Sequence, residues 1–167
     1  MKKAALVIIK PDGIAKGIAG HILNKFSEAN LQMVGLRLTR VSRELAKEHY
    51  QNIQGKPFFR DVIEYLIGQY HREKKVLIII YYGEKAIAKC RNIAGLTNPE
   101  EAAPQTIRGA FGRITTKGVY ENVVHVSSDD TEAEREVKLW FKPQDILVKL
   151  YPTKTIKRKE QTIKIWA

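Results

Sequence analysis

The chain has 167 residues, of which 44% are hydrophobic and 28% are charged, and its formal net charge is +11. This length fits one domain, and this composition is ordinary for a soluble globular protein, so the sequence excludes a disordered or fibrous chain. The positive charge favours anionic partners, namely nucleotides, nucleic acid or an acidic surface.

Three features of the chain favour a cytoplasmic protein without a membrane span. The first apolar run is interrupted at Lys10-Pro11-Asp12, too early for a signal peptide. The longest apolar stretch, residues 76–82, is much shorter than the roughly 20 residues of a membrane-spanning helix. The single cysteine, Cys90, cannot form an internal disulfide and gives no sign of an oxidising compartment.

The first third of the chain alternates strand and helix patterns. Residues 4–9 form an apolar run that ends at a Lys-Pro-Asp-Gly turn signal, which predicts a buried strand. Within residues 14–31, apolar side chains recur every four positions and predict one helix with an apolar face. Residues 34–38 alternate in the manner of a half-exposed strand.

A helical hairpin is predicted next. Ser42 is a candidate cap for a helix in which Leu45, His49 and Tyr50 share one side. After a Gly-Lys-Pro break, residues 58–67 repeat apolar side chains at helical spacing. The two helices are therefore expected to pair.

The second half of the chain completes the predicted fold. It contains a central strand (76–82), a helix (85–93), a long loop (95–118), a strand (119–126) and a helix capped by Asp129 or Asp130. With the hairpin set aside, the order is βαββαβ, followed by a C-terminal helix. We expect an α/β (α+β) fold, a ferredoxin-like antiparallel sheet sandwich covered by helices.

His125 is the first candidate for chemistry, because it ends a predicted strand just before a helix start. Glu136, on the next helix, could hold one ring nitrogen and leave the other as a nucleophile. Ser127 is either a hydroxyl behind this pair or a helix cap. Taken alone, His125 could equally be structural and Glu136 a solvated glutamate.

Cationic side chains offer a second candidate site. Lys10 would emerge at a strand edge, where its ammonium could hold a phosphate or could simply be solvated. Arg91, Thr97 and Arg108 could converge with it, and two guanidinium groups suit a triphosphate because each grips oxygens bidentately. Spacing alone does not establish that convergence.

Other phosphate-binding and metal-binding motifs are missing from the sequence. It contains no G-x-x-x-x-G-K-[ST] loop, no G-x-G-x-x-G and no protein-kinase signature. The four histidines stand far apart along the chain and no cysteines are paired, so we expect no metal held by the protein itself.

The strings IIKPDG, HY, PFF, TNP, TIRG, N-x-x-H and E-x-x-x-WF occur in this order. Over about residues 4–151 the chain thereby resembles the nucleoside diphosphate kinase family. The resemblance implies a domain over residues 1–151 and leaves residues 152–167 as a basic extension. It also implies Mg2+ as cofactor, nucleoside di- and triphosphates as substrates, and a homo-oligomer, either a hexamer or a tetramer.

The resemblance implies a role for each matching residue. His125 would be the nucleophile, oriented by Glu136 with Ser127 behind it, and Tyr50 would lie near it. The implied nucleotide-binding residues are Lys10, Phe58, Val62, Arg91, Thr97, Arg108, Val119 and Asn122. The γ-phosphate would pass to His125 and then to a diphosphate, by ping-pong kinetics with little base discrimination.

The chain departs from the family pattern at several positions. Val126 replaces a glycine or alanine and predicts crowding beside His125, Ser128 replaces an aspartate, and Ala110 replaces another. The stretches 69–75 and 111–121 are longer than usual. The alternative function is therefore a catalytically weakened nucleotide-binding or regulatory module. Nucleic-acid binding through the basic tail could coexist with either function.

Overall fold

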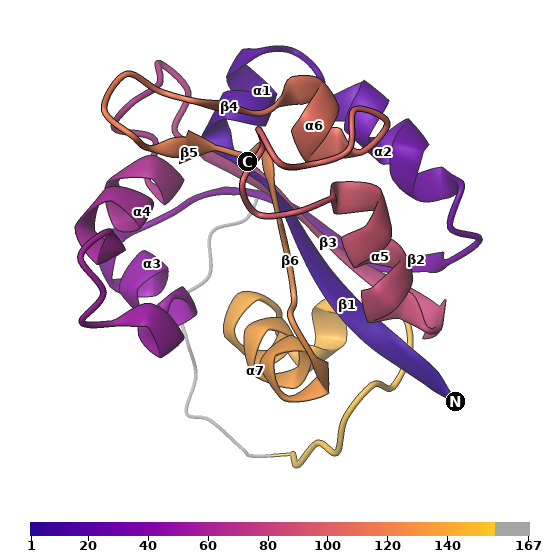
Figure 1. Ribbon diagram of the computed structural model, residues 1–167. Coiled ribbons are helices and arrows are strands. Elements are labelled where there is room, and N and C mark those ends of the chain that lie inside the picture. The colour runs from indigo at the N-terminus through magenta and orange to yellow at the C-terminus, as the bar shows by residue number, and fades with distance from the viewer. Residues whose placement is uncertain (156–167) are drawn as a thin grey trace, which may run out of the picture.

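A four-stranded antiparallel sheet forms the centre of the computed structural model, which describes residues 1–155 (Figure 1). Its strands are β1 (Lys2–Ile9), β2 (Gln32–Arg40), β3 (Lys75–Glu84) and β6 (Val124–Val126), in the order β2-β3-β1-β6. Every neighbouring pair is antiparallel. The predicted ferredoxin-like βαββαβ arrangement is confirmed.

The two central strands are apolar on both faces, because helices cover both sides of the sheet. Leu6 and Ile8 of β1 face α7 (Asp130–Trp140) and the helical hairpin. Val7 and Ile9 face the opposite side, with α2 (Ala19–Ser27) and α5 (Ala86–Ala94). Because side chains alternate along a strand, residues 4–9 of β1 divide between these two layers, and the residues of β6 alternate likewise.

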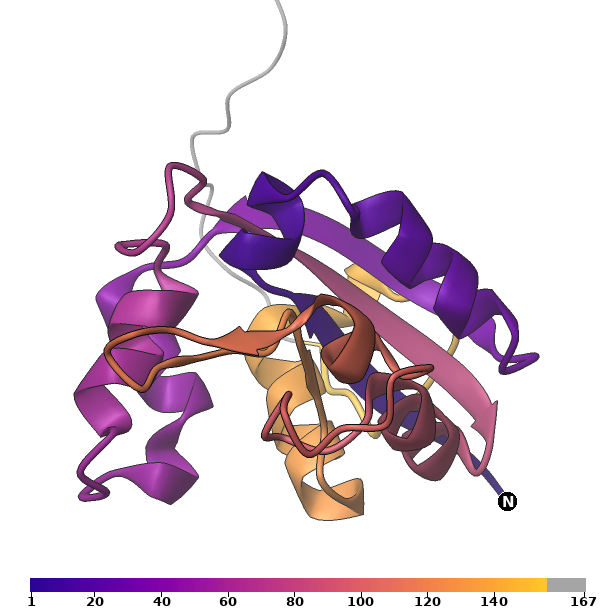
Figure 2. The same ribbon diagram turned by 45° about the horizontal axis from the view of Figure 1, so that its top comes forward.

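The helical hairpin lies beside the sheet, as Figure 2 shows. It consists of α3 (Arg43–His49), the short 3-10 turn η1 (Gln51–Ile53) and α4 (Phe59–Leu66). The backbone N–H of Leu45 donates a hydrogen bond of 3.1 Å to the hydroxyl of Ser42, which confirms the predicted cap.

Three sequence-based boundaries were wrong. The helix predicted over 14–31 is two helices, α1 (Pro11–Ala15) and α2, separated at Gly17, whose φ is +70°. The strand predicted over 119–126 is β5 (Tyr120–Glu121) followed by β6, because Val123 interrupts it with a φ of +67°. The predicted loop contains α6 (Ile107–Phe111) and β4 (Arg113–Ile114), and β4 pairs with β5.

Strand β2, at one end of the sheet, exposes apolar side chains. Leu36 and Leu38 are 56% and 58% exposed, whereas Arg37 between them donates to the Trp140 carbonyl oxygen at 3.1 Å. A β-bulge between Met33 and Gly35 sets this register. The alternation predicted the strand correctly, but Leu36 and Leu38 lie on its less covered face, whereas Val34 is buried in the core.

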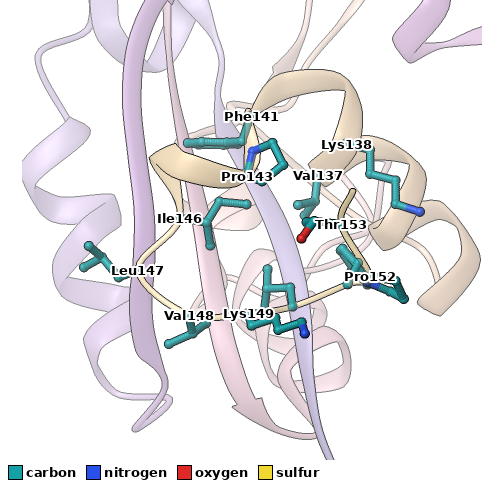
Figure 3. Close-up of a pocket in the computed structure, with 12 residues that line it drawn as sticks. Val137, Lys138, Phe141, Pro143, Ile146, Leu147, Val148, Lys149, Pro152 and Thr153 are labelled. Carbon is teal, nitrogen blue, oxygen red and sulfur yellow. The ribbon is translucent and has the colours of Figure 1, made fainter. Parts of the chain in front are cut away.

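After α7 the chain passes through the 3-10 turn η2 (Pro143–Asp145) and returns along β2, where Leu147 N–H donates to Val34 O at 2.9 Å. A cavity of about 370 Å³ separates this segment from α7 (Figure 3). Within residues 1–155, no helix is long and apolar enough to cross a membrane. Most of the predicted basic extension lies outside the described residues, so its role stays a prediction.

Candidate active site

A cavity of about 540 Å³ opens between the helical hairpin, β6, α7 and the β4–β5 hairpin. It shares no lining residue with the cavity beneath the C-terminal segment. Eleven residues proposed from the sequence line it: Lys10, Tyr50, Phe58, Val62, Arg91, Thr97, Arg108, Val119, Asn122, His125 and Glu136. Ser127, the twelfth, lies behind the wall. Residues from distant parts of the sequence therefore meet in one site.

His125 and Glu136 form a hydrogen-bonded pair at one wall of the cavity. His125 lies opposite Ile8 on the α7 side of β6, and its Nε2 is 2.7 Å from Glu136 Oε1. The Ser127 hydroxyl donates to the other oxygen of Glu136 at 2.5 Å. Glu136 is buried, so both of its oxygens are held by the protein. With a proton on Nε2, the Nδ1 lone pair of His125 is left for chemistry.

Lys10 is buried rather than solvated at a strand edge, which corrects the expectation from its position after β1. Its ammonium donates to Asn122 Oδ1 at 2.7 Å and lies 4.9 Å from the centre of the Tyr65 ring. Burial and then the charge of Arg108 lower the pKa of Lys10 to about 7, against an opposing effect of Asp12.

A strained turn at Val123 positions Asn122. Val123 is a β-branched residue with φ +67°, a conformation rarely seen in such residues. Around it, Val124 N–H donates to Asn122 O at 2.7 Å, and Lys10 N–H donates to Val123 O at 2.8 Å. The Asn122 amide then donates to Thr97 O at 2.9 Å. Strain held in place by its surroundings is typical of functional sites.

Arg108 and Arg91 add positive charge to the same end of the cavity. Arg108 donates from its two terminal nitrogens to Gly95 O and Val124 O, at 2.8 and 3.0 Å. Burial lowers the pKa of Arg108 to about 10, so it remains charged at neutral pH. Its buried Nε has no partner among the described residues. With Lys10, these side chains suit a polyphosphate.

The opposite end of the cavity is apolar. Phe58 and Val62 lie one helical turn apart at the start of α4, and Val119 approaches from the β4–β5 hairpin. Phe58 is 51% exposed, so its ring is open to a ligand. Burial raises the pKa of Tyr50, which therefore stays protonated as a hydroxyl donor between these ends.

The sequence-based analysis missed His49 and Tyr65 as cavity residues. Tyr65 falls three positions after Val62 on the same face of α4, so helical spacing could have found it. The expectation that the histidines stand apart was wrong in space, because the His49 and His125 ring centres are 4.4 Å apart. With Glu136 they form the one group of potential metal ligands among the described residues.

The predicted crowding of the nucleophile by Val126 is not supported by the packing. Val126 pairs with Val7, is buried, and belongs to the layer under α2 and α5. His125 belongs to the opposite layer, since neighbouring side chains on a strand point to opposite faces. Although Val126 reaches the cavity wall, its side chain fills the core behind the sheet.

A protein-family model described as "Nucleoside diphosphate kinase" matches residues 3–146. This chain belongs to the nucleoside diphosphate kinase family. A protein of that name from Pyrococcus furiosus is 40% identical over 141 residues, covering 84% of each chain. Another, from Bacillus licheniformis, is 39% identical and covers 84% of this chain and 89% of the relative.

Solved structures with the same family name share the fold. The nucleoside diphosphate kinase of Halobacterium salinarum, in complex with CDP, is 31% identical with a TM-score of 0.79, covering 89% of this chain and 93% of that one. A second structure is a transition-state mimic of the nucleoside diphosphate kinase of Borrelia burgdorferi with bound vanadate and ADP. It is 30% identical with a TM-score of 0.78, covering 89% of this chain and 92% of that one.

The stretches 69–75 and 111–121 meet each other beside the cavity. His71, in the first stretch, has its Nε2 3.7 Å from the buried carboxylate of Glu121, at the end of the second. Arg113 donates to the other oxygen of Glu121 at 2.5 Å. In this member of the nucleoside diphosphate kinase family, the two stretches are therefore in contact through His71 and Glu121.

Proposed function

We propose that this chain is a nucleoside diphosphate kinase that moves the γ-phosphate of a nucleoside triphosphate to a nucleoside diphosphate through phosphorylated His125. The observation that carries the proposal is the His125–Glu136–Ser127 chain of hydrogen bonds, which faces a cavity rich in positive charge. A nucleophile held by an orienting partner is what covalent catalysis requires.

In the proposed first half-reaction, the Nδ1 lone pair of His125 attacks the γ-phosphorus. The bond from this phosphorus to the bridging oxygen breaks, and its electrons leave with the nucleoside diphosphate. Glu136 holds the proton on Nε2 and offsets the positive charge that the ring gains. In the second half-reaction an oxygen of another diphosphate attacks, and the nitrogen–phosphorus electrons return to Nδ1.

The two ends of the cavity would bind different parts of the nucleotide, the positively charged end the phosphates and the apolar end the base. Lys10, Arg91 and Arg108 would stabilise the charge spread over the transferring phosphoryl group. Phe58 would stack on the base, and stacking tolerates every base because each has an aromatic face. The proposed enzyme therefore accepts nucleotides of different bases.

Mg2+ fits this site as an ion that arrives with the nucleotide. Three carboxylates line the cavity, and each already accepts a hydrogen bond within the protein: Glu136 from Ser127, Glu132 from Arg135 and Asp61 from Tyr70. Mg2+ commonly takes phosphate oxygens and waters as ligands. When bound, it would neutralise part of the phosphate charge.

A homo-oligomer and a cytoplasmic location complete the proposal. The exposed apolar side chains Met33, Leu36 and Leu38 on β2 support association of subunits, because a row of such side chains at a sheet edge favours burial. Sedimentation measures the subunit number, which we expect to be four or six.

The test is to incubate the protein with γ-labelled ATP and Mg2+ and to chase with unlabelled GDP. Acid-labile, alkali-stable label should form and then leave as GTP. His125→Ala should form no label while keeping its fold, whereas His21→Ala, at an exposed histidine, should be labelled normally. Nucleotide binding without any label in the unchanged protein would favour the weakened module instead.

A further inference from the structure

The geometry points to Trp140 and His49 as a pair of positioning residues: the Trp140 indole holds His49 in the tautomer that cannot take the Glu136 carboxylate away from His125. This inference rests on the proposed role of His125 as nucleophile. It concerns two residues that do not touch the transferred phosphate and act through the groups that do.

Trp140 fixes the protonation of His49. The Trp140 Nε1–H lies 3.1 Å from His49 Nδ1. An indole nitrogen can only donate, so His49 Nδ1 must be the acceptor and carry no proton. Burial and then the charge of His125 hold the pKa of His49 well below its usual value, so the ring is neutral with its single proton on Nε2.

The tautomer matters because of what else His49 Nδ1 approaches. It lies 3.9 Å from Glu136 Oε1, the same oxygen that His125 Nε2 contacts at 2.7 Å. If Nδ1 carried a proton, it would become a second donor for that oxygen and compete with His125. With a lone pair there instead, Glu136 Oε1 is left to His125.

The same ring also limits how far His125 can turn. The His49 and His125 rings meet edge to face at 79°, with centres 4.4 Å apart. One hydrogen bond donated to Glu136 fixes a point on the His125 ring but leaves rotation about that bond free. His49 blocks this rotation, and Trp140, one helical turn after Glu136 on α7, supports His49 from behind.

A core-packing role alone explains His49 poorly. Its side chain is fully buried, and its Nε2 has no partner among the described residues. A buried N–H without a partner destabilises a fold, and an apolar ring of similar size would avoid this cost. A histidine at this position is explained if its Nδ1 accepts the hydrogen bond from Trp140 and donates none to Glu136.

The experiment compares three variants of the full chain: Trp140→Phe, His49→Phe and the double variant. Rapid-quench phosphorylation of the enzyme by saturating labelled ATP gives the rate of the first half-reaction. Trp140→Phe should lower this rate about tenfold with nearly unchanged nucleotide affinity, because the freed Nδ1 can then compete for Glu136. His49→Phe keeps a ring beside His125 but has no nitrogen to compete for Glu136, so its rate is the reference for the double variant.

The double variant is decisive. Because it lacks the competing nitrogen, it should react as fast as His49→Phe. The loss of rate that Trp140→Phe causes alone should therefore be absent. If the two residues only fill the core, their losses should add and the double variant should be slower than either single one. That result, or a Trp140→Phe variant of undiminished rate, would overturn the inference.

NMR of 15N-labelled histidine provides a readout that does not depend on activity. His49 should show protonated Nε2 in the unchanged protein and a mixture of tautomers in Trp140→Phe, and identical tautomers in both would also overturn the inference. If Trp140→Phe does not fold, a benzothiophene analogue of tryptophan, introduced with Trp166→Phe, replaces the N–H with sulfur and so removes the hydrogen-bond donor. If the wild-type protein never forms phosphohistidine, the proposed function is refuted, whereas NMR can still test the tautomer of His49.

Discussion

Lys10 gives the sharpest prediction, because its burial links nucleotide binding to proton uptake. In the free protein, burial and the charge of Arg108 lower the Lys10 pKa to about 7. Phosphate oxygens favour the charged ammonium, so binding should raise this pKa back toward its ordinary value. The bound protein then holds more protons above pH 7, and the affinity for nucleotide must fall as the pH rises.

The size of the effect follows from the pKa. At pH 8 a group with a pKa near 7 is only about one-tenth protonated, so binding should take up about 0.9 proton, compared with about 0.1 at pH 6. Between pH 7 and pH 9, the dissociation constant for ADP should rise about 50-fold, provided that the bound pKa lies well above 9.

Calorimetry in buffers of different ionisation enthalpy measures the uptake directly. Lys10→Met is the control, because it removes the ammonium and leaves the ionisation of the nucleotide phosphates unchanged. The difference between the two proteins should be close to one proton at pH 8 and near zero at pH 6. Equal uptake by both proteins at pH 8 would refute the argument, since Lys10 would then be charged before binding.

Three further changes separate packing from chemistry. Phe58→Ala should weaken nucleotide binding by about 1–3 kcal/mol for every base alike while the melting temperature stays unchanged, and a loss confined to one base would contradict the stacking role. Val126→Ala should lower stability to denaturant by about 1–3 kcal/mol without a faster turnover, because its side chain fills the core, and a faster enzyme would restore the crowding hypothesis. Gly95→Ala should cost at least about 1–2 kcal/mol in denaturant unfolding, because φ is +86° and the added Cβ would lie 2.3 Å from Thr106 Oγ1. It should also weaken nucleotide binding in a titration, because Gly95 O accepts a hydrogen bond from Arg108. Normal stability and affinity would show that the loop adjusts freely.

The motif residues could be chosen from the sequence because each is a chemically distinctive side chain at an element boundary. His125 before a helix cap and Lys10 after an apolar strand are both visible in this way. Phe58 and Val62 were assigned through the family resemblance, and they lie one turn apart at the start of α4. Their common position around one cavity could not be predicted from local patterns, because it depends on how the hairpin docks against β6.

Errors in the boundaries arose where tertiary contacts override local preference. A valine is a good strand residue, yet Val123 takes a left-handed conformation because Lys10 and Val124 hold the turn around it. Lys10 was expected at a strand edge, either holding a phosphate or solvated, but its hydrogen bond to Asn122 and its contact with Tyr65 hold it in the interior.

The sequence by itself determined the order of the main strands and helices, the antiparallel sheet and the side chains able to carry phosphoryl chemistry. These follow from periodicity and residue type, which are local properties. Only the tertiary structure decided that His49 reaches His125, that Val126 faces away from it, and that Lys10 is buried. These depend on the face of each strand and on how α3 and α7 pack, so they are set by contacts between residues far apart in the chain.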